Sequence, residues 1–312
     1  MTDSTAAWAG GRVHVRAPGK LNLSLEVGDV QPDGYHDVAS AYQAVSLYED
    51  LWAQPADDFT IAVTGTVDVS GVPQDDRNLA LRAARLLAKE VGHTGGVHLD
   101  IVKHVPVAGG MGGGSADAAA ALVACDALWG AELGTAGLQR LASRLGADVP
   151  FALMGGTAIG TGRGDQLSPA LAKGRFDWVI VPAEGGLSTP EVYSRLDELR
   201  DRHGVDIAPP PRSPAVAPAV LHALRAGDAD ALAEHARNDL QVAALSLRPD
   251  LRAVLELGEQ SGALMGIVSG SGPTLAFLTG TPEAALELQV TLAASGRTAL
   301  HVHGPVAGAR LM

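Results

Sequence analysis

Apolar and polar residues alternate along two stretches near the start of the chain, residues 13–16 and 21–27. A period of two is typical of β-strands that bury one face, so both stretches predict strands. Between them, Pro18 and Gly19 predict a bend or a bulge, which places Lys20 at a strand end. On this pattern alone, an ordinary surface lysine is the default interpretation. Further strands are expected at 42–52, 59–63, 97–102 and 176–182.

Apolar residues recur at spacings of three and four in the later segments, which predicts amphipathic helices at 76–91 and 136–145. The second of these precedes Gly146, a residue typical of helix C-caps. A glycine-punctuated hairpin is expected at 155–164. Thr189 and Pro190 suit the N-cap and the first position of a further helix. The remainder predicts helices at 230–245, 249–260 and 282–294 and strands at 264–268, 275–278 and 299–302.

A glycine-rich loop that runs into an alanine-rich helix, continuing to Trp129, is the strongest single signal. The loop consists of Pro106, Val107, Ala108, Gly109, Gly110, Met111, Gly112, Gly113, Gly114, Ser115 and Ala116. Glycine lets the backbone approach a ligand closely, and the unpaired N–H groups and dipole of a helix N-terminus attract anions. The pattern therefore predicts a phosphate site. A flexible linker, or a helix packed tightly on a sheet, is the alternative interpretation.

This loop is neither of the two commonest nucleotide motifs. Ala116 and Asp117 stand where GxxxxGK[ST] needs a lysine and a hydroxyl, and Ser115 stands at the last glycine of GxGxxG. Backbone amides would therefore hold the phosphates. Any catalytic cation has to come from another part of the chain.

Length and composition indicate the broad class of protein. With 312 residues, of which 46% are hydrophobic, the chain can bury one large core or two ordinary ones, and two domains are expected. Five prolines between residues 208 and 218 predict a linker or an extended crossing of the surface. The single cysteine, Cys125, cannot form an internal disulfide and suits a reducing compartment.

Charge and hydropathy exclude several classes of partner. The formal net charge of −12 disfavours nucleic acid and anionic membrane surfaces. No apolar run has membrane-spanning length, and residues 1–11 lack the basic and apolar regions of a signal peptide. We therefore expect a cytoplasmic protein with small-molecule partners, and the sequence leaves its oligomeric state open.

Three further features are candidates for chemistry. Tyr35 and His36 follow a turn at Pro32, and stacking plus an edge hydrogen bond is how proteins hold a base, although a tyrosine packed on its own hairpin is equally compatible. Asp148 stands alone among apolar neighbours, where capping of local backbone is the default and a cavity-facing carboxylate is the alternative. The second glycine loop, 269–274, predicts a wide hairpin or a wall that closes over the site.

The order of these segments resembles a known superfamily. Pro18-Gly19-Lys20-Leu21-Asn22-Leu23, the loop at 106–116 and Gly270-Ser271-Gly272-Pro273-Thr274 resemble the three motifs of the GHMP kinases, which include galactokinase, homoserine kinase and mevalonate kinase. Asp33-Gly34-Tyr35-His36 and Gly146-Ala147-Asp148-Val149-Pro150-Phe151 are similar to the branch that acts on 4-diphosphocytidyl-2-C-methyl-D-erythritol in the non-mevalonate isoprenoid route. Each motif is weak singly, and the set is specific.

The resemblance implies a fold and a reaction. The fold is α+β with two domains, an N-terminal α/β domain like that of a ribosomal protein over 1–165 and a C-terminal ferredoxin-like α/β plait over 166–312, with the active site in the cleft between them. The reaction transfers the γ-phosphate of ATP, with Mg²⁺, to the 2-hydroxyl of the cytidylyl substrate. In this scheme Asp148 takes the hydroxyl proton, and Lys20 orients Asp148 and steadies the charge on the phosphoryl group.

The resemblance also assigns binding roles. Residues 106–116 would bind ATP, and Ser115 is a candidate contact for magnesium, with no acidic ligand identified. Tyr35 would stack on the cytosine, His36 would read its edge, and Tyr193 would cover the opposite face. Substrate contacts are assigned to Asn22, Tyr35, His36, Thr189, Tyr193, Gly270, Ser271 and Gly272.

Two other functions fit part of the pattern. A GHMP kinase for homoserine or mevalonate would have no nucleobase to bind, so Tyr35 and His36 argue against it. A nucleotide-binding sensor of the same fold would not need both Lys20 and Asp148.

Overall fold

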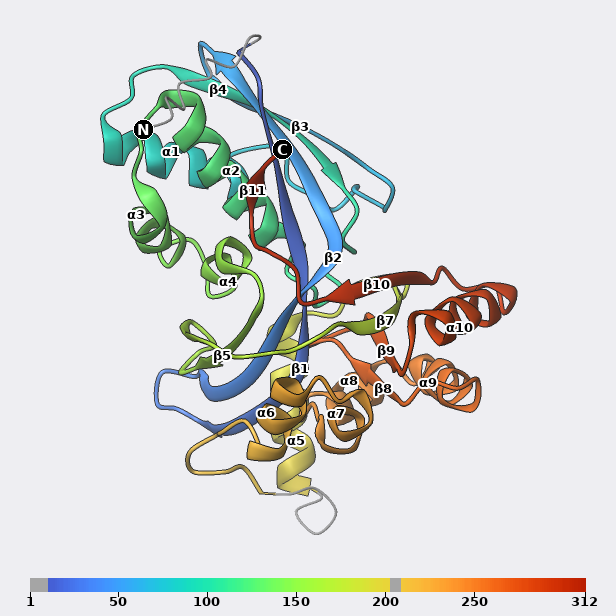
Figure 1. Cartoon of the computed structure of the whole chain (residues 1–312). Helices are drawn as coiled ribbons and strands as arrows, with labels where there is room; N and C mark the ends of the chain where they lie inside the picture. Colours follow the sequence, from blue (N-terminus) through green and yellow to red (C-terminus); the bar gives the residue numbers. More distant parts are fainter. Residues whose placement is uncertain (1–10, 203–208) are drawn as a thin grey trace.

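The computed structural model describes residues 11–202 and 209–312. Over these residues the chain forms a seven-stranded mixed sheet in the order β11-β1-β2-β4-β3, with β5 beside β2 and β6 beside β5, and a four-stranded antiparallel sheet in the order β10-β7-β9-β8. Figure 1 shows most of the larger sheet in the upper half of the view and the smaller sheet in the lower half. The predicted α+β class is confirmed.

The first two strands, β1 (Val13–Val30) and β2 (His36–Ala56), pair antiparallel and run from the upper into the lower part of the molecule (Figure 1). The two separate strands predicted at 13–27 are one strand, because the chain passes Pro18 and Gly19 through a register shift without leaving the sheet. A Cβ on Gly19 would lie 3.1 Å from the Val105 side chain, so the bulge lets β1 lie against the residues that precede the glycine loop. Lys20 therefore lies within the strand, not at its end.

Four helices cover one face of the larger sheet (Figure 1): α1 (Leu79–Val91), α2 (Gly113–Trp129), α3 (Gly134–Ala142) and α4 (Val149–Met154). The same sheet contains β3 (Phe59–Gly65) and β4 (Gly96–Lys103). The core between them is rich in alanine from α2, and it includes Cys125, which is fully buried. Small side chains allow α2 to lie close to the sheet, which puts its N-terminus next to the bulge in β1.

Two helix ends differ from the prediction. α1 begins three residues later than expected, because the Asn78 side chain accepts a hydrogen bond from the Ala80 N–H at 2.9 Å and so caps the helix. α3 ends at Ala142, so Gly146 does not cap it. The last turn tightens instead, with the Leu145 N–H donating to the Ala142 carbonyl at 2.9 Å.

The second half of the chain builds the smaller sheet and its helices. In chain order these elements are β7 (Phe176–Val181), α5 (Thr189–Arg202), α6 (Pro218–Ala226), α7 (Ala229–His235), α8 (Gln241–Leu247), α9 (Asp250–Gln260), β8 (Met265–Val268), β9 (Leu275–Thr279), α10 (Pro282–Ala294) and β10 (Leu300–Gly304). A strand, helices, two strands, a helix and a strand in this order form the ferredoxin-like arrangement. The expected plait is confirmed.

The helix predicted at 230–245 is in fact two helices, α7 and α8. The chain turns between them at Asn238, whose side chain accepts from the Leu240 N–H and donates to the Val268 and Gly270 carbonyls. These partners lie far away in the sequence, so the apolar period could not reveal the break. Helix α6 was not predicted.

The proline-rich segment crosses the surface in an extended form. Its described part, 209–217, contains neither helix nor strand, and residue 208 lies outside the described residues. The Ala215 N–H donates to Glu26 Oε2 at 2.7 Å and Val216 is buried, so the segment packs along β1. The expectation of an extended crossing is confirmed.

The larger sheet also receives strands from later in the chain. The predicted hairpin is formed by β5 (Thr157–Thr161) and β6 (Gln166–Pro169), and its β5 pairs with β2. Strand β11 (Arg310–Leu311) pairs with β1. The end of the chain therefore returns to the first sheet (Figure 1). The boundary between 165 and 166 stays a prediction.

Candidate active site

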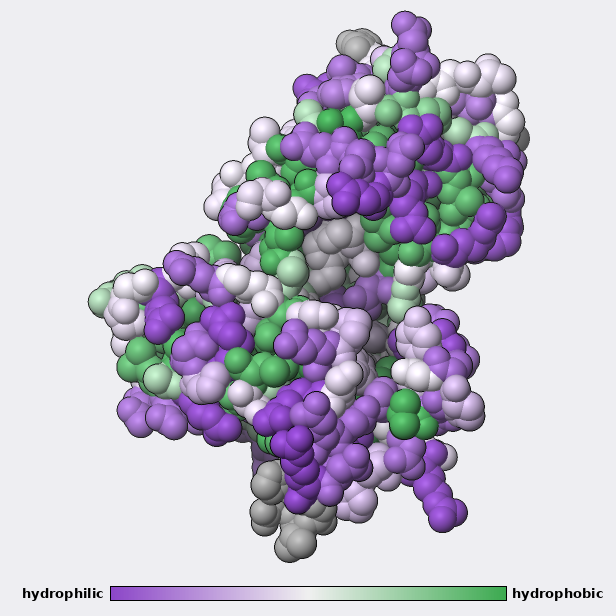
Figure 2. Space-filling view, turned by 180° about the vertical axis from the view of Figure 1, so that it is seen from behind, coloured by the Kyte–Doolittle hydropathy of each residue, from purple (hydrophilic) through white to green (hydrophobic). Residues whose placement is uncertain are grey.

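The two glycine loops lie against each other at the junction of the two sheets. The Ser269 hydroxyl donates to the Gly110 carbonyl at 3.2 Å, and a Cβ on Gly110 would lie 2.0 Å from the Ser269 carbonyl oxygen. Gly110 also has a φ of +79°, so only glycine suits this position. The first loop is tied to β1 as well, because the Lys20 N–H donates to the Met111 carbonyl at 2.9 Å. Figure 2 shows an indentation in the molecular outline between the upper and lower parts.

A first cavity of about 370 Å³ opens over the glycine-rich loop and the start of α2. Among the described residues it is lined by Gly71, Val72, Pro73, Arg77, Asn78, Leu79, Lys103, Pro106, Val107, Ala108, Gly109, Gly110, Gly112, Gly113, Gly114, Ser115 and Asp117. Met111 and Ala116 are fully buried and do not line it. Gly112 caps α2 through its backbone alone, so the first amides of the helix are available to a ligand.

A second cavity of about 380 Å³ adjoins the first, and both are lined by Gly110, Gly112 and Ser115. Its other lining residues are Lys20, Asn22, Leu25, Val38, Tyr42, Ala147, Asp148, Arg163, Thr189, Tyr193, Leu240, Gly270 and Ser271. Seven of the predicted catalytic and substrate residues therefore share one cavity. Tyr35, His36 and Gly272 are not among its lining residues.

Lys20 and Asp148 approach each other in this second cavity. Lys20 Nζ lies 2.6 Å from Asn22 Oδ1 and 3.8 Å from Asp148 Oδ2. Asn22 in turn donates to the Ser40 hydroxyl at 2.7 Å, which fixes its orientation. Asp148 precedes α4, yet within the described chain its carboxylate makes no capping hydrogen bond. The default interpretation of Asp148 as a cap is therefore wrong, and the carboxylate is available to a ligand.

The Lys20 and Asp148 side chains stand beside two tyrosines. Lys20 Nζ lies 5.4 Å from the centroid of the Tyr42 ring. Burial, with the Asp148 charge as a second cause, raises the pKa of Tyr42 well above its ordinary value and that of Tyr193 to about 12. Both phenols are therefore neutral at physiological pH.

The predicted base-binding residues lie in two places. His36 is buried, its Nε2 lies 3.0 Å from Asp197 Oδ1, and its ring centroid lies 5.0 Å from that of Tyr193. Tyr35 is 57% exposed, and the Arg163 guanidinium lies over its ring at 4.0 Å. His36 and Tyr193 thus come together, whereas Tyr35 extends outward from the turn.

The second glycine loop is held from both sides. Asn238 Nδ2 donates to the carbonyls of Val268 at 2.8 Å and Gly270 at 2.7 Å. The hydroxyls of Thr189 and Ser271 lie 2.9 Å apart, so Thr189 is bonded to this loop and does not use its side chain as the predicted N-cap. Gly272 supports the turn, where its N–H donates to the Ser269 carbonyl at 2.9 Å.

A buried charge cluster, Glu49, Lys103 and Asp117, lies beneath the start of α2 and was missed by the sequence analysis. Lys103 Nζ lies 2.5 Å from Glu49 Oε1 and 2.7 Å from Asp117 Oδ2, and a Cβ on Gly113 would lie 2.8 Å from Glu49 Oε1. Burial, with the Asp117 charge as a second cause, raises the pKa of Glu49 to about 8. Asp117 Oδ1 is buried and has no hydrogen-bond partner in the described part of the chain. The only sequence signal was that Lys103 and Asp117 flank the loop.

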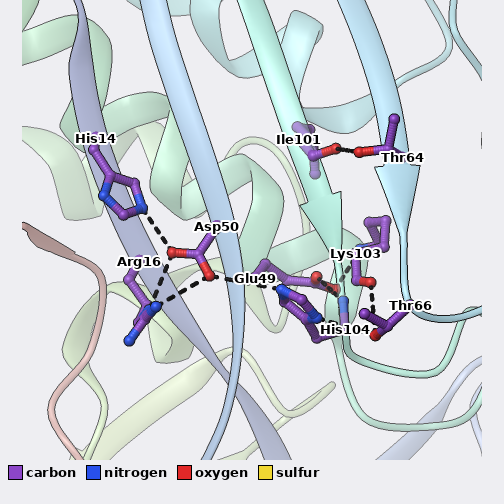
Figure 3. Close-up of polar contacts among 9 residues, drawn as sticks. All are labelled: His14, Arg16, Glu49, Asp50, Thr64, Thr66, Ile101, Lys103 and His104. Atoms are coloured by element: carbon purple, nitrogen blue, oxygen red, sulfur yellow. Dashed lines mark hydrogen bonds and ion pairs between the residues drawn. The ribbon is translucent and has the colours of Figure 1, made fainter.

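His104 links this cluster to charges on the other face of β2. Its N–H donates to Glu49 Oε2 at 2.9 Å, and its ring Nε2 lies 3.7 Å from Asp50 Oδ2 (Figure 3). Asp50 also accepts from Arg16 at 3.1 Å and lies 2.6 Å from His14 Nε2. Adjacent residues of β2 therefore hold the end of β4, from which the glycine-rich loop begins.

Neither a membrane-spanning helix nor a metal cluster is found in the described residues. No described helix is long and apolar enough to cross a membrane. In the same residues, no group of three or more His, Cys, Asp or Glu side chains could hold a metal ion by itself.

Similarity to known proteins identifies the family. Residues 78–156 match the GHMP kinases N terminal domain and residues 220–298 the GHMP kinases C terminal domain. The chain is 62% identical over 301 residues to the 4-diphosphocytidyl-2-C-methyl-D-erythritol kinase of Leifsonia xyli subsp. xyli, covering 96% of this chain and 98% of the relative. It is 60% identical over 309 residues to the enzyme of the same name from Clavibacter michiganensis subsp. michiganensis, covering 99% of both chains.

Solved structures agree with this assignment. A crystal structure of 4-(cytidine 5'-diphospho)-2C-methyl-D-erythritol kinase matches with a TM-score of 0.74 and 32% identity, covering 93% of this chain and 98% of that one. The homoserine kinase of Cytophaga hutchinsonii shares the fold, with a TM-score of 0.71 at 17% identity over 97% of this chain and 98% of that one. The chain therefore belongs to the GHMP kinases and, within them, to the 4-diphosphocytidyl-2-C-methyl-D-erythritol kinases.

Proposed function

We propose that this chain is an ATP-dependent kinase that phosphorylates the 2-hydroxyl of 4-diphosphocytidyl-2-C-methyl-D-erythritol, a step toward isoprenoid precursors. The observation that carries the proposal is the position of Lys20 and Asp148, 3.8 Å apart in a cavity that shares a wall with the amide-lined cavity over α2. One cavity suits ATP and the other suits the acceptor. The reacting groups would meet where the two cavities join.

ATP would occupy the first cavity. Residues 112–115 line it at the positive end of α2, and their amides would bind the phosphates. Val72, Pro73 and Leu79 supply an apolar wall for the purine. Phosphate binding here would depend on backbone dipoles and would need no lysine in the loop.

A magnesium ion fits the junction of the cavities. Ser115 lines both cavities, and its hydroxyl is a hard oxygen donor. Mg²⁺ usually keeps waters and substrate phosphates among its ligands and takes few from the protein. Ser115 would hold the ion together with the nucleotide, and the ion would supply charge neutralisation at the phosphates.

Asp148 and Lys20 would carry the chemical step. Asp148 accepts the proton of the acceptor hydroxyl as that oxygen forms its bond to the γ-phosphorus, the bond from the γ-phosphorus to the bridging oxygen breaks, and ADP leaves. Lys20 holds Asp148 in position and offsets the negative charge on the phosphoryl group. Asn22 keeps the ammonium in place through its 2.6 Å contact.

The cytosine would bind where Tyr193 lines the second cavity, next to His36. His36 would read the edge of the base, with Asp197 setting the orientation of its ring, and Tyr193 would stack on the base. Tyr35 would close the other face from the turn. Thr189 and the loop at 270–272 would contact the remainder of the substrate.

An assay of ADP release with the cytidylyl substrate, homoserine and mevalonate in parallel tests the proposal. We expect turnover with the cytidylyl substrate alone, and turnover with either of the others in its place would contradict the substrate assignment. Asp148→Asn should lower kcat by about 10² to 10⁴-fold. Asp76→Asn, at an 81% exposed side chain paired with Arg85, is the matched control and should retain activity.

The remaining expectations are part of the same proposal. The chain acts on small molecules as its relatives do, and neither nucleic acid nor a membrane is needed for the reaction. A cytoplasmic setting accords with a free cysteine, Cys125, that is buried in the core.

A further inference from the structure

The second cavity contains a cation for which the reaction gives no role. Among the described residues that line it, the lysine and arginine side chains are those of Lys20 and Arg163. Lys20 is already engaged with Asn22 at 2.6 Å and with Asp148 at 3.8 Å. Arg163 lies in the turn between β5 and β6, outside all the motifs that identified the family.

The turn that carries Arg163 is fixed against the wall of the cavity. Gly162 and Gly164 on either side have φ values of +67° and +87°, which favour glycine. The Gly162 carbonyl accepts from the Val38 N–H at 2.7 Å, and a Cβ on Gly164 would lie 2.5 Å from the Tyr42 hydroxyl. The hairpin is therefore seated on β2 in a set position, and Arg163 extends from a rigid base.

The present partners of Arg163 hold it only loosely. Its guanidinium pairs with Asp33 and lies 4.0 Å from the centroid of the Tyr35 ring. The side chains of Arg163 and Asp33 are each 51% exposed, and ion pairs at such exposure contribute little stability. A guanidinium has five N–H donors in a planar fork that suits phosphate oxygens, so the Asp33 carboxylate satisfies only part of it.

We propose that Arg163 binds the diphosphate bridge of the acceptor substrate and that Asp33 competes with this bridge for the guanidinium. The proposal rests on the proposed function, because it assumes an acceptor with a cytidine diphosphate group. That group brings about two negative charges into a cavity that already contains Asp148, in a chain of net charge −12. A cation other than Lys20 is needed to offset them.

The position of Arg163 agrees with the geometry of such a substrate. The diphosphate connects the base, near His36 and Tyr193, to the hydroxyl that reacts near Asp148. Arg163 lines the same cavity and contacts Tyr35, the residue next to His36. In this arrangement the Tyr35 ring also supports the guanidinium, which explains why an exposed tyrosine stands at this turn.

Calorimetry that measures the affinities of the full chain for CDP and for cytidine distinguishes a phosphate-binding role of Arg163 from a structural one. Arg163→Gln should weaken CDP binding about 10- to 100-fold, the usual cost of a charged hydrogen bond to phosphate, and leave cytidine within about twofold. Arg163→Lys should recover part of the loss, because it keeps the charge without the fork. Asp33→Asn should tighten CDP binding by about two- to fivefold, because it removes the competing charge.

Arg85→Gln is the matched control. Arg85 also lies over an aromatic ring, that of Phe59 at 4.7 Å, and pairs with an exposed carboxylate, Asp76 at 2.9 Å, but it lines neither cavity. Binding of both ligands should be unchanged in this variant.

Three results would overturn the inference. Equal losses for CDP and cytidine in Arg163→Gln would mean that Arg163 only holds the turn for the base. Unchanged CDP affinity in that variant would mean that it makes no contact with the phosphates. A wild-type chain that binds neither CDP nor cytidine would overturn the proposed function itself, and this inference with it.

Discussion

The buried cluster of Glu49, Lys103 and Asp117 predicts that stability falls as the pH rises through neutrality. Two carboxylates face one ammonium, and burial followed by the charge of Asp117 raises the pKa of Glu49 from 4.5 to about 8. Because the two carboxylates interact strongly, the retained proton belongs to the pair. The folded chain therefore keeps a proton that the unfolded chain has released.

The sign and size of the effect follow from this difference in bound protons. Between pH 4.5 and 8 the folded state binds more protons than the unfolded state, so the free energy of unfolding decreases with pH. One proton corresponds to a slope of about 1.4 kcal/mol per pH unit. From pH 5 to pH 8 the cluster should therefore cost at most about 4 kcal/mol of stability.

Urea unfolding at several pH values, compared between the wild type and Glu49→Gln, measures this slope. The variant leaves one carboxylate, Asp117, for one ammonium, so the proton that the two carboxylates share in the wild type has no second carboxylate to bind. The two proteins should be closest in stability at pH 5, and the variant should be the more stable at pH 9. Glu90→Gln, at a partly exposed glutamate paired with Arg140 at 2.8 Å, should keep the wild-type slope.

A constant difference between the wild type and Glu49→Gln from pH 5 to pH 9 would refute the reasoning. Such a result would mean that both carboxylates are ionised throughout, with the cluster carrying a net negative charge beneath the phosphate loop. Equal changes of slope in Glu49→Gln and Glu90→Gln would refute it too, because they would point to the net charge of the chain and not to the cluster.

Three further substitutions test the site. Gly110→Ala should lower the melting temperature in a thermal scan and abolish activity, because the new Cβ would lie 2.0 Å from the Ser269 carbonyl oxygen at a backbone φ of +79°. Gly114→Ala is the control and should keep the melting temperature, because its Cβ would have nothing within 4 Å. Asn238→Ala removes both side-chain hydrogen bonds to the second glycine loop, so the KM for the acceptor should rise while the KM for ATP changes little. The free energy of unfolding, measured with a chemical denaturant, should fall by about 1–3 kcal/mol. Lys20→Ala should lower kcat at least as much as Asp148→Asn in the ADP-release assay, and near wild-type turnover would contradict its role.

Local signals in the sequence predicted most of the elements and several of the site residues. The helix at 282–294 was predicted with its observed bounds, and in the structure Thr281 caps it and Pro282 opens it. The glycine run predicted that a helix follows it, although α2 already begins at Gly113, within the predicted loop. Asp148 was a candidate because a charge among apolar residues is conspicuous, although only the fold shows that its carboxylate does not cap α4.

The features that were missed depend on contacts between distant parts of the chain. Glu49, Lys103 and Asp117 come from β2, β4 and α2, and no spacing in the sequence relates them. The break between α7 and α8 exists because Asn238 finds its acceptors 30 and 32 residues away. Arg163 resembled any other residue of a polar turn until the hairpin was seated on β2. In each case contacts with distant residues determine the local structure, and the sequence pattern around the residue does not indicate those contacts.

Two separate requirements account for the glycines of the glycine-rich loop at 106–116. Lys103 is held between two carboxylates, so it offers no unpaired charge to a phosphate, and under the proposed function the loop amides are left to bind the phosphates of ATP. Gly113 has to be glycine because a Cβ there would lie 2.8 Å from Glu49 Oε1 in the buried charge cluster. At Gly114 a Cβ would have nothing within 4 Å, so no contact among the described residues requires glycine there, and the proposed binding of phosphates is the reason that remains. The same run of residues therefore meets the packing requirement of the buried cluster and, under the proposed function, also leaves its amides open to the phosphates of ATP. A side chain at Gly113 would disturb the cluster first.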